Sequence, residues 1–329
     1  MEKLKILEFA DPVCTWCWGT SPIIRALEYR YGEQIEIEYA MVGMVDDIRT
    51  FNNRRLKIGG DNIELSNRNM LKHWLDASGV HGMPVEEHHF HLFSEKYLST
   101  LPQCKAYIAA RLCSPINKDG VRDTKMAHKY FRRLQEATAA EAMQTGDANI
   151  LSDLSAVVGF DPEKFRELLD SSKVQQIYEE DKELAKHYGV ESTPTFLLTY
   201  KRQELLLQGF TTYETIEHNI RQFTYGEISP EKCERSNRTK LTNENVAHYI
   251  EHYGSVYPVD IATAFGLKRH GGHTALNIES YEHLPNILDE LIHKEKIAIT
   301  PKANSYMIYS LHEGRTQTQE RMHEVAGTY

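Results

Sequence analysis

Two cysteines three residues apart, Cys14 and Cys17 in the run Cys-Thr-Trp-Cys, are the residues whose types and spacing most directly suggest chemistry. The run follows a short apolar segment and opens a predicted helix. A cysteine at a helix N-terminus faces unpaired backbone N–H groups and the positive end of the helix dipole, and both favour the thiolate. A second cysteine one turn later can attack the mixed disulfide that the first one forms. The spacing therefore predicts a redox-active pair, with Cys14 as the exposed nucleophile and Cys17 as the partly buried resolving thiol.

Half of a zinc site, or plain packing, is the alternative for such a pair. Structural zinc sites usually need a second Cys or His pair at comparable spacing. Cys104 and Cys113 are nine residues apart in helix-period sequence and are typical of core positions, whereas Cys233 lies in a polar stretch and could be an exposed thiol. Residues 86–91 are rich in His and Glu, but they are more typical of a solvated helix face. We predict no metal site.

The elements that would position the cysteine pair form a β-α-β unit. Residues 5–9 have the pattern of a short buried strand, and Asp11-Pro12 ends it. A helical period follows over about 14–31, and residues 34–43 alternate as a second strand. The cysteine pair is therefore predicted at the first strand-to-helix junction.

A long helical region separates this unit from a second group of strands. It is too long and too periodic for a loop. Strand patterns return at 195–200 and 204–208, joined by a polar turn, and a helix is predicted over about 213–223. The helix-period segments between the two groups cover 70–78, 102–113, 124–140, 150–158 and 162–188.

A compact unit with three helices and a terminal hairpin follows a polar stretch. Its predicted elements are helices at 243–253, 258–265 and 281–294 and strands at 297–300 and 305–310. This outline is typical of a winged-helix module. DNA binding would need a basic recognition helix. The segment from residue 236 onward has nine Lys and Arg against eleven Asp and Glu, and its third helix is acidic, so domain packing or protein interaction is the better interpretation.

The sequence thus predicts an α/β protein with five parts. They are an α/β domain made of residues 1–53 and 189–225, an inserted helical domain at 54–188, a linker at 226–238, a winged-helix-like α+β module at 239–312 and a polar tail at 313–329.

Composition excludes several classes of protein. The 329 residues are 41% hydrophobic and 26% charged, which suits a globular core. The net charge of −9 argues against binding to nucleic acid or anionic lipid by bulk electrostatics. Five cysteines are too few for a secreted disulfide framework, and no apolar run is long enough to span a bilayer. The chain begins directly with strand pattern instead of a signal peptide, so we expect a cytoplasmic protein.

Three stretches of sequence together resemble a known family. They are Leu7-Glu-Phe-Ala-Asp-Pro-Val-Cys-Thr-Trp-Cys-Trp18, Pro22 shortly after it, and Val190-Glu-Ser-Thr-Pro-Thr-Phe196. They are similar to the DsbA-type branch of the thioredoxin superfamily, and most of all to its cytoplasmic FrnE-like and hydroxychromene-carboxylate-isomerase-like group. The resemblance covers about residues 3–225 and implies a thioredoxin-like fold with a large helical insertion. It does not extend to the terminal module.

The resemblance implies roles for three positions besides the cysteine pair. Thr193 and Pro194 match the loop whose cis-proline faces the cysteines and whose backbone pairs with an extended substrate. Glu8 matches an acid beneath the cysteines that assists deprotonation of the buried thiol, although it could also be a solvated residue at the strand edge. Trp16 and Trp18 flank the cysteines, where they would either hold an apolar substrate segment or pack on the insertion.

The function expected from these observations is a cytoplasmic thiol–disulfide oxidoreductase that reduces or isomerises disulfides of proteins or peptides. It needs no cofactor, although glutathione could be its reductant. Two alternatives remain open. One is a DsbA-like adapter that delivers proteins to a protease and senses stress through its cysteines. The other is a glutathione-dependent isomerase of small aromatic compounds, which usually has Ser at the position of Cys14. The oligomeric state is left open.

Overall fold

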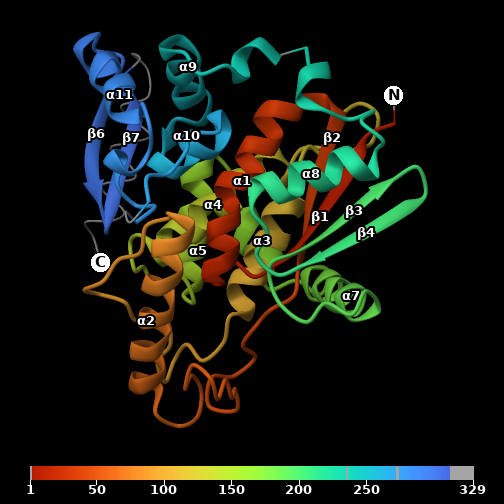
Figure 1. Cartoon of the computed structure of the whole chain (residues 1–329). Coiled ribbons are helices and arrows are strands. Elements are labelled where there is room, and N and C mark those ends of the chain that lie inside the picture. The colour runs from red at the N-terminus through yellow and green to blue at the C-terminus, as the bar shows by residue number, and fades with distance from the viewer. Residues whose placement is uncertain (1, 235, 272–273, 312–329) are drawn as a thin grey trace.

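A four-stranded mixed sheet forms the centre of the N-terminal part of the protein (Figure 1). The computed structural model describes residues 2–234, 236–271 and 274–311. Strands β1 and β2 are parallel, whereas β3 runs antiparallel to β1 and β4 antiparallel to β3. The order across the sheet is β2-β1-β3-β4, with β1 at Leu4–Ala10, β2 at Ile35–Met41, β3 at Thr195–Tyr200 and β4 at Gln203–Gln208.

Alternation along β1 separates two faces of this sheet. Ile6 and Glu8 point to the face covered by α1 (Thr15–Tyr31) and α8 (Tyr213–Phe223), where Ile220 of α8 joins the main core. Phe9 points to the opposite face, where it packs with Ala185 of α7. The predicted order β-α-β followed by β-β-α is confirmed.

Six helices lie between β2 and β3, and together they form the predicted helical insertion. The prediction of one helix over 162–188 is wrong, because two helices share this segment. Ser171 breaks it: its hydroxyl accepts a hydrogen bond from the backbone N–H of Val174 and starts a new helix. The helices are α2 (Ile63–His81), α3 (Leu101–Cys113), α4 (Lys125–Ala139), α5 (Ala148–Val158), α6 (Pro162–Leu169) and α7 (Ser172–His187).

The C-terminal module (residues 243–310) contains the three predicted helices and the predicted hairpin, and it adds a two-residue strand that completes a small antiparallel sheet. Its third helix begins at Leu284, three residues later than predicted. In chain order the elements are α9 (Asn243–Tyr253), β5 (Ser255–Val256), α10 (Pro258–Phe265), α11 (Leu284–His293), β6 (Ile297–Lys302) and β7 (Ser305–Ser310). The predicted tail at 313–329 lies outside the described residues.

Helix α10 packs along α1, which joins the C-terminal module to the rest of the protein (Figure 1). Asp260 of α10 is fully buried, and its carboxylate lies 2.9 Å from the guanidinium of Arg132 and 3.6 Å from that of Arg25. A buried carboxylate is tolerated only with such partners. The module is therefore docked through an ionic contact that excludes water.

The segment 226–238, which we predicted as a polar linker, packs on the protein surface. It forms two short 3-10 helices, Pro230–Lys232 and Ser236–Thr239. Ile228 and Cys233 are both buried, and the side chain of Gln34 donates a hydrogen bond to the carbonyl of Ser229 at 2.9 Å. The expectation that Cys233 is an exposed thiol is therefore wrong.

Candidate functional site

The junction between β1 and α1 places Cys14 at the N-cap of α1. Its backbone is extended (φ −75°, ψ 120°), and Thr15 is the first helical residue. The N–H of Cys14 donates to the carbonyl of Asp11 at 3.0 Å, and the Asp11 carboxylate accepts from the N–H of Val13 at 2.7 Å. Asp11 thus fixes the turn that presents the cysteine at the helix end.

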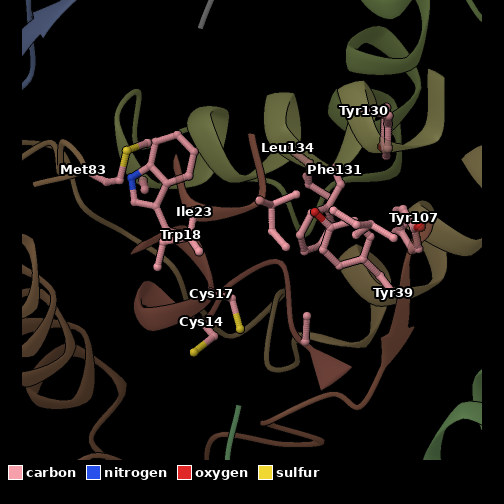
Figure 2. Close-up of a cluster of buried hydrophobic side chains, with 14 of the residues drawn as sticks. Cys14, Cys17, Trp18, Ile23, Tyr39, Met83, Tyr107, Tyr130, Phe131 and Leu134 are labelled. Atoms are coloured by element: carbon pink, nitrogen blue, oxygen red, sulfur yellow. The ribbon is translucent and has the colours of Figure 1, made fainter. Parts of the chain in front are cut away.

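The two cysteines are free thiols that interact with each other, and they lie at the start of α1 (Figure 2). A hydrogen bond from the Cys17 thiol lowers the pKa of Cys14, against the opposing effect of burial, and the interaction with Thr193 lowers it further. Burial, together with the bond to Cys14 and its charge, raises the pKa of Cys17 well above its usual value. Cys14 is therefore the thiol that ionises first, in the order expected of a nucleophile and a resolving thiol.

The prediction that Cys14 is exposed is wrong. Its exposed fraction is 5%, and that of Cys17 is 1%. The loop before β3 covers it, because the Cys14 thiol lies 3.4 Å from the carbonyl oxygen of Thr193 and donates to it. Cys14 is still the more accessible of the two sulfurs.

Thr193 and Pro194 lie next to Cys14, although they are 179 residues away in the sequence. The peptide bond between them is cis. Thr195 anchors the end of this loop, because its hydroxyl donates to the carbonyl of Ser192 at 2.7 Å. The structure therefore brings together the two segments on which the resemblance rested.

Glu8 is fully buried on the sheet face that α1 covers. Its Oε1 accepts a hydrogen bond from the Thr20 hydroxyl at 2.7 Å, and its Oε2 has no hydrogen-bond partner among the described residues. Burial raises the pKa of Glu8 to about 8, with the Thr20 bond opposing it. Thr20 also lies 2.8 Å from the carbonyl of Cys17. Burial excludes the alternative of a solvated acid, and the proximity to Cys17 fits the role that the resemblance implies.

Trp16 and Trp18 differ in their surroundings. Trp16 is half-buried and its ring packs 5.2 Å from that of Phe210, which follows β4. Trp18 is 1% exposed: its indole N–H donates to the carbonyl of Pro84 at 2.9 Å, and the guanidinium of Arg132 lies 4.5 Å from its ring. Trp18 therefore has no free face for a substrate, so of its two interpretations the structure supports packing.

Sequence reasoning missed two polar residues beside the cysteines. His81, the last residue of α2, contacts Thr15 between the two cysteines. Asp11 is fully buried, and its pKa is raised by burial while hydrogen bonds from Val13, Thr100 and Met44 oppose the rise. The pairing of Asp11 with a Pro could have been interpreted as a capped turn, but no signal in the sequence connects His81 to the cysteines.

The remaining candidates lie outside the cysteine pair, although the Cys104 thiol hydrogen-bonds to Asp11. Cys104 is fully buried and Cys113 partly buried, as expected of packing residues. Residues 86–91 form an irregular segment instead of the predicted helix face. Among the described residues, no group of three or more Asp, Glu, His or Cys side chains is placed to hold a metal ion. None of the helices in the described ranges has the length and apolar character that crossing a bilayer requires.

The curated relatives that match this chain carry one name. The chain is 23% identical over 301 residues to a protein of Halalkalibacterium halodurans named ClpXP adapter protein SpxH, a match that covers 91% of this chain and 86% of the relative. The Bacillus subtilis protein of the same name is 21% identical over 232 residues, which is 70% of each chain. The first match leaves only about 30 residues of this chain unmatched, so it includes most of the C-terminal module.

Solved structures resemble about 70% of this chain. A protein from Nitrosomonas europaea assigned as a protein disulfide isomerase superposes with a TM-score of 0.56 at 17% identity, covering 69% of this chain and all of the other. A protein from Streptomyces coelicolor assigned as a DsbA oxidoreductase has a TM-score of 0.50 at 15% identity, covering 70% of this chain and 93% of the other. These likenesses concern the fold.

A family model described as thioredoxin matches residues 7–218, well over half of the chain. This range begins just before the cysteine pair and ends in α8, and it includes the loop at Thr193 and Pro194. The chain belongs to the DsbA-like thioredoxin family.

Proposed function

We propose that this protein is an adapter of the ClpXP type, which binds a client protein and delivers it for proteolysis, and that the cysteine pair makes this binding sensitive to oxidation. The similarity to the adapter of H. halodurans carries the proposal, because it extends over 91% of this chain and 86% of the relative. The solved structures assigned as an isomerase and an oxidoreductase cover 69% and 70% of this chain. The match to this adapter is long enough to include most of the C-terminal module, which supports the proposal.

Burial of the cysteine pair supports an adapter over an efficient catalyst. A thiolate must reach the sulfur of a substrate disulfide in line with the bond that breaks. The 5% exposed fraction of Cys14 limits the access of a protein disulfide in the conformation described. Small oxidants meet a weaker steric barrier. They oxidise the thiolate, and the lowered pKa of Cys14 increases the fraction of that form.

The test is reconstituted proteolysis. Purified ClpXP and ATP are incubated with an extract of the source cells, with and without this protein, and the half-life of each extract protein is measured by quantitative mass spectrometry. The proposal expects one or a few proteins to be degraded at least several-fold faster with the reduced protein, and less so after its oxidation. The double variant Cys14→Ser, Cys17→Ser keeps the acceleration and loses the response to oxidation. If no half-life changes, the proposal is wrong.

Thiol–disulfide exchange is the second candidate, and the opposite pKa shifts of the two cysteines favour it. In this reaction the Cys14 thiolate attacks a substrate disulfide and forms a mixed disulfide, and the first substrate thiol leaves. Glu8 takes the proton of the Cys17 thiol, which then attacks Cys14. The substrate leaves fully reduced, the two cysteines form a disulfide, and Thr193 and Pro194 hold the substrate backbone. A cellular thiol such as glutathione would reduce the pair again.

Insulin reduction with glutathione separates the two candidates. Turnover that Cys14→Ser abolishes supports the oxidoreductase, whereas an adapter shows little turnover in either form. Glutathione-dependent turnover of an aromatic compound that survives loss of both cysteines would favour the isomerase instead, although the Cys at position 14 counts against it.

We also propose a cytoplasmic location, which fractionation of the source cells tests.

A further inference from the structure

His81 lies between the helical insertion and the cysteine pair. It is the last residue of α2 and is 5% exposed. Its ring contacts three residues of α1, namely Thr15, Trp16 and Gly19. Two of them are the residues that separate Cys14 from Cys17.

Hydrogen bonds determine which tautomer of the His81 imidazole is present. Nδ1 lies 3.1 Å from the backbone N–H of Met83 and accepts from it, so the ring proton is on Nε2. Nε2 then donates to the hydroxyl of Thr15 at 3.4 Å. Burial lowers the pKa of His81 to about 3, so the ring stays neutral throughout the physiological range. His81 thus acts through shape and hydrogen bonding, without a charge.

Packing against α1 is equally restrictive. The His81 ring meets the Trp16 ring nearly edge-on, with centroids 5.9 Å apart and planes at 77°. On the other side it lies so close to Gly19 that a Cβ there would be 2.6 Å from Cγ of His81. The rings of Phe210 and His73 also pack on that of Trp16, with centroid distances of 5.2 and 6.3 Å respectively. The first turn of α1 is therefore held from outside by a side chain of the insertion.

We propose that His81 is a positioning residue for the cysteine pair, which fixes the first turn of α1 through the hydroxyl of Thr15 and the ring of Trp16. The backbone N–H groups of this turn stabilise the thiolate of Cys14 only while they are held towards its sulfur. A helix of the insertion thus sets the reactivity of a thiol on the thioredoxin-like part. The property concerns the thiol itself, so it is independent of whether the protein is an adapter or an enzyme.

Two amide variants separate the two hydrogen bonds of His81. In His81→Gln the side-chain amide reaches the position of Nε2 and donates to Thr15. In His81→Asn the amide reaches only the position of Nδ1 and keeps the bond to Met83. The rate at which iodoacetamide alkylates Cys14 in the reduced full-length protein is measured from pH 4 to 10, with the modified peptide identified by mass spectrometry.

The proposal expects His81→Asn to shift the pH profile of Cys14 upward by about one unit, which lowers the thiolate fraction about tenfold below the pKa, while His81→Gln stays close to wild type. Equal profiles for the two variants overturn it, even when both lower the melting temperature, because a purely structural role predicts that result. Thr15→Val leaves His81 packed in place and removes only its acceptor. An unchanged profile in Thr15→Val overturns the proposal whether or not the His81 variants fold.

Discussion

The buried carboxyl of Glu8 gives the most direct test of the electrostatics beneath the cysteine pair. Replacing it in Glu8→Gln keeps the shape of the side chain and an oxygen that accepts from Thr20. It removes the ability to ionise. Both proteins should carry Cys14→Ser and Cys17→Ser, so that ionisation of the thiols does not contribute to the comparison.

The expected magnitude follows from the pKa of Glu8, which is about 8 in the folded protein against 4.5 for the free side chain. Burial, the largest cause of the rise, persists in the serine background, which loses only the smaller contribution of the Cys14 charge. Because the folded pKa is the higher one, the protonated acid is favoured by folding. Its contribution to stability is complete below pH 4.5 and is lost as the pH rises through 8. At about 1.4 kcal/mol per pH unit, the total loss is about 5 kcal/mol.

Urea unfolding of both proteins at pH 4.5 and pH 8.5 measures this difference. Between these two values, the free energy of unfolding of the Glu8 protein should fall by about 4 kcal/mol relative to the Gln variant. Other groups titrate equally in the two proteins and cancel. A constant offset between the proteins at both pH values would show that Glu8 ionises normally, and it would remove Glu8 as a proton acceptor for the second cysteine.

Three further substitutions test other contacts. Gly19→Ala places a Cβ against the imidazole ring of His81 and should lower the free energy of unfolding in urea by about 1–3 kcal/mol. The control Gly79→Ala, whose new Cβ meets no atom of the described residues within 4 Å beyond its own helix, should be neutral or stabilising. Equal costs for the two variants would contradict this packing. Cys17→Ala removes the hydrogen bond that most lowers the pKa of Cys14, so the thiolate absorbance of Cys14 should titrate at a higher pH. An unchanged midpoint would show that this hydrogen bond does not lower the pKa. Asp260→Asn removes the carboxylate that pairs with the buried Arg132 and the partly buried Arg25, and should cost about 3–5 kcal/mol. Limited proteolysis should then release the C-terminal module, and a resistant, equally stable variant would refute the ionic docking.

Local patterns were sufficient to predict most elements, because each has a clear period and a clear end. The helix at Tyr213–Phe223 and the strand at Thr195–Tyr200 lie where the sequence predicts them. A two-residue strand such as Ser255–Val256 has no period at all, and it exists because β7 offers it a partner. The break near Ser171 was missed because a capping serine inside an amphipathic run does not interrupt the apolar spacing.

Tertiary contacts explain what could not be predicted at the site. Spacing identified the cysteine pair, but the burial of Cys14 depends on a loop 179 residues away. The burial of Trp18 depends on Arg132 and on Tyr257 of the C-terminal module, whose ring lies 6.0 Å from the indole. His81 acts on the cysteines only because Gly19 lets α2 approach α1. These pairings are set by how three parts of the chain pack, and no local pattern records them.

Helix α1 is where these three parts meet, and this bears on the choice between the two candidate functions. One end of the helix carries the cysteine pair, while Trp18 and Arg25 on its sides contact the insertion and the C-terminal module. Because Cys14 is enclosed in this way, an oxidoreductase would have to open the site to a protein disulfide in each turnover. An adapter needs no turnover. For the proposed adapter, a dithiol at the junction of all three parts is well placed, since a single oxidation there acts on the helix that contacts the sheet, the insertion and the C-terminal module.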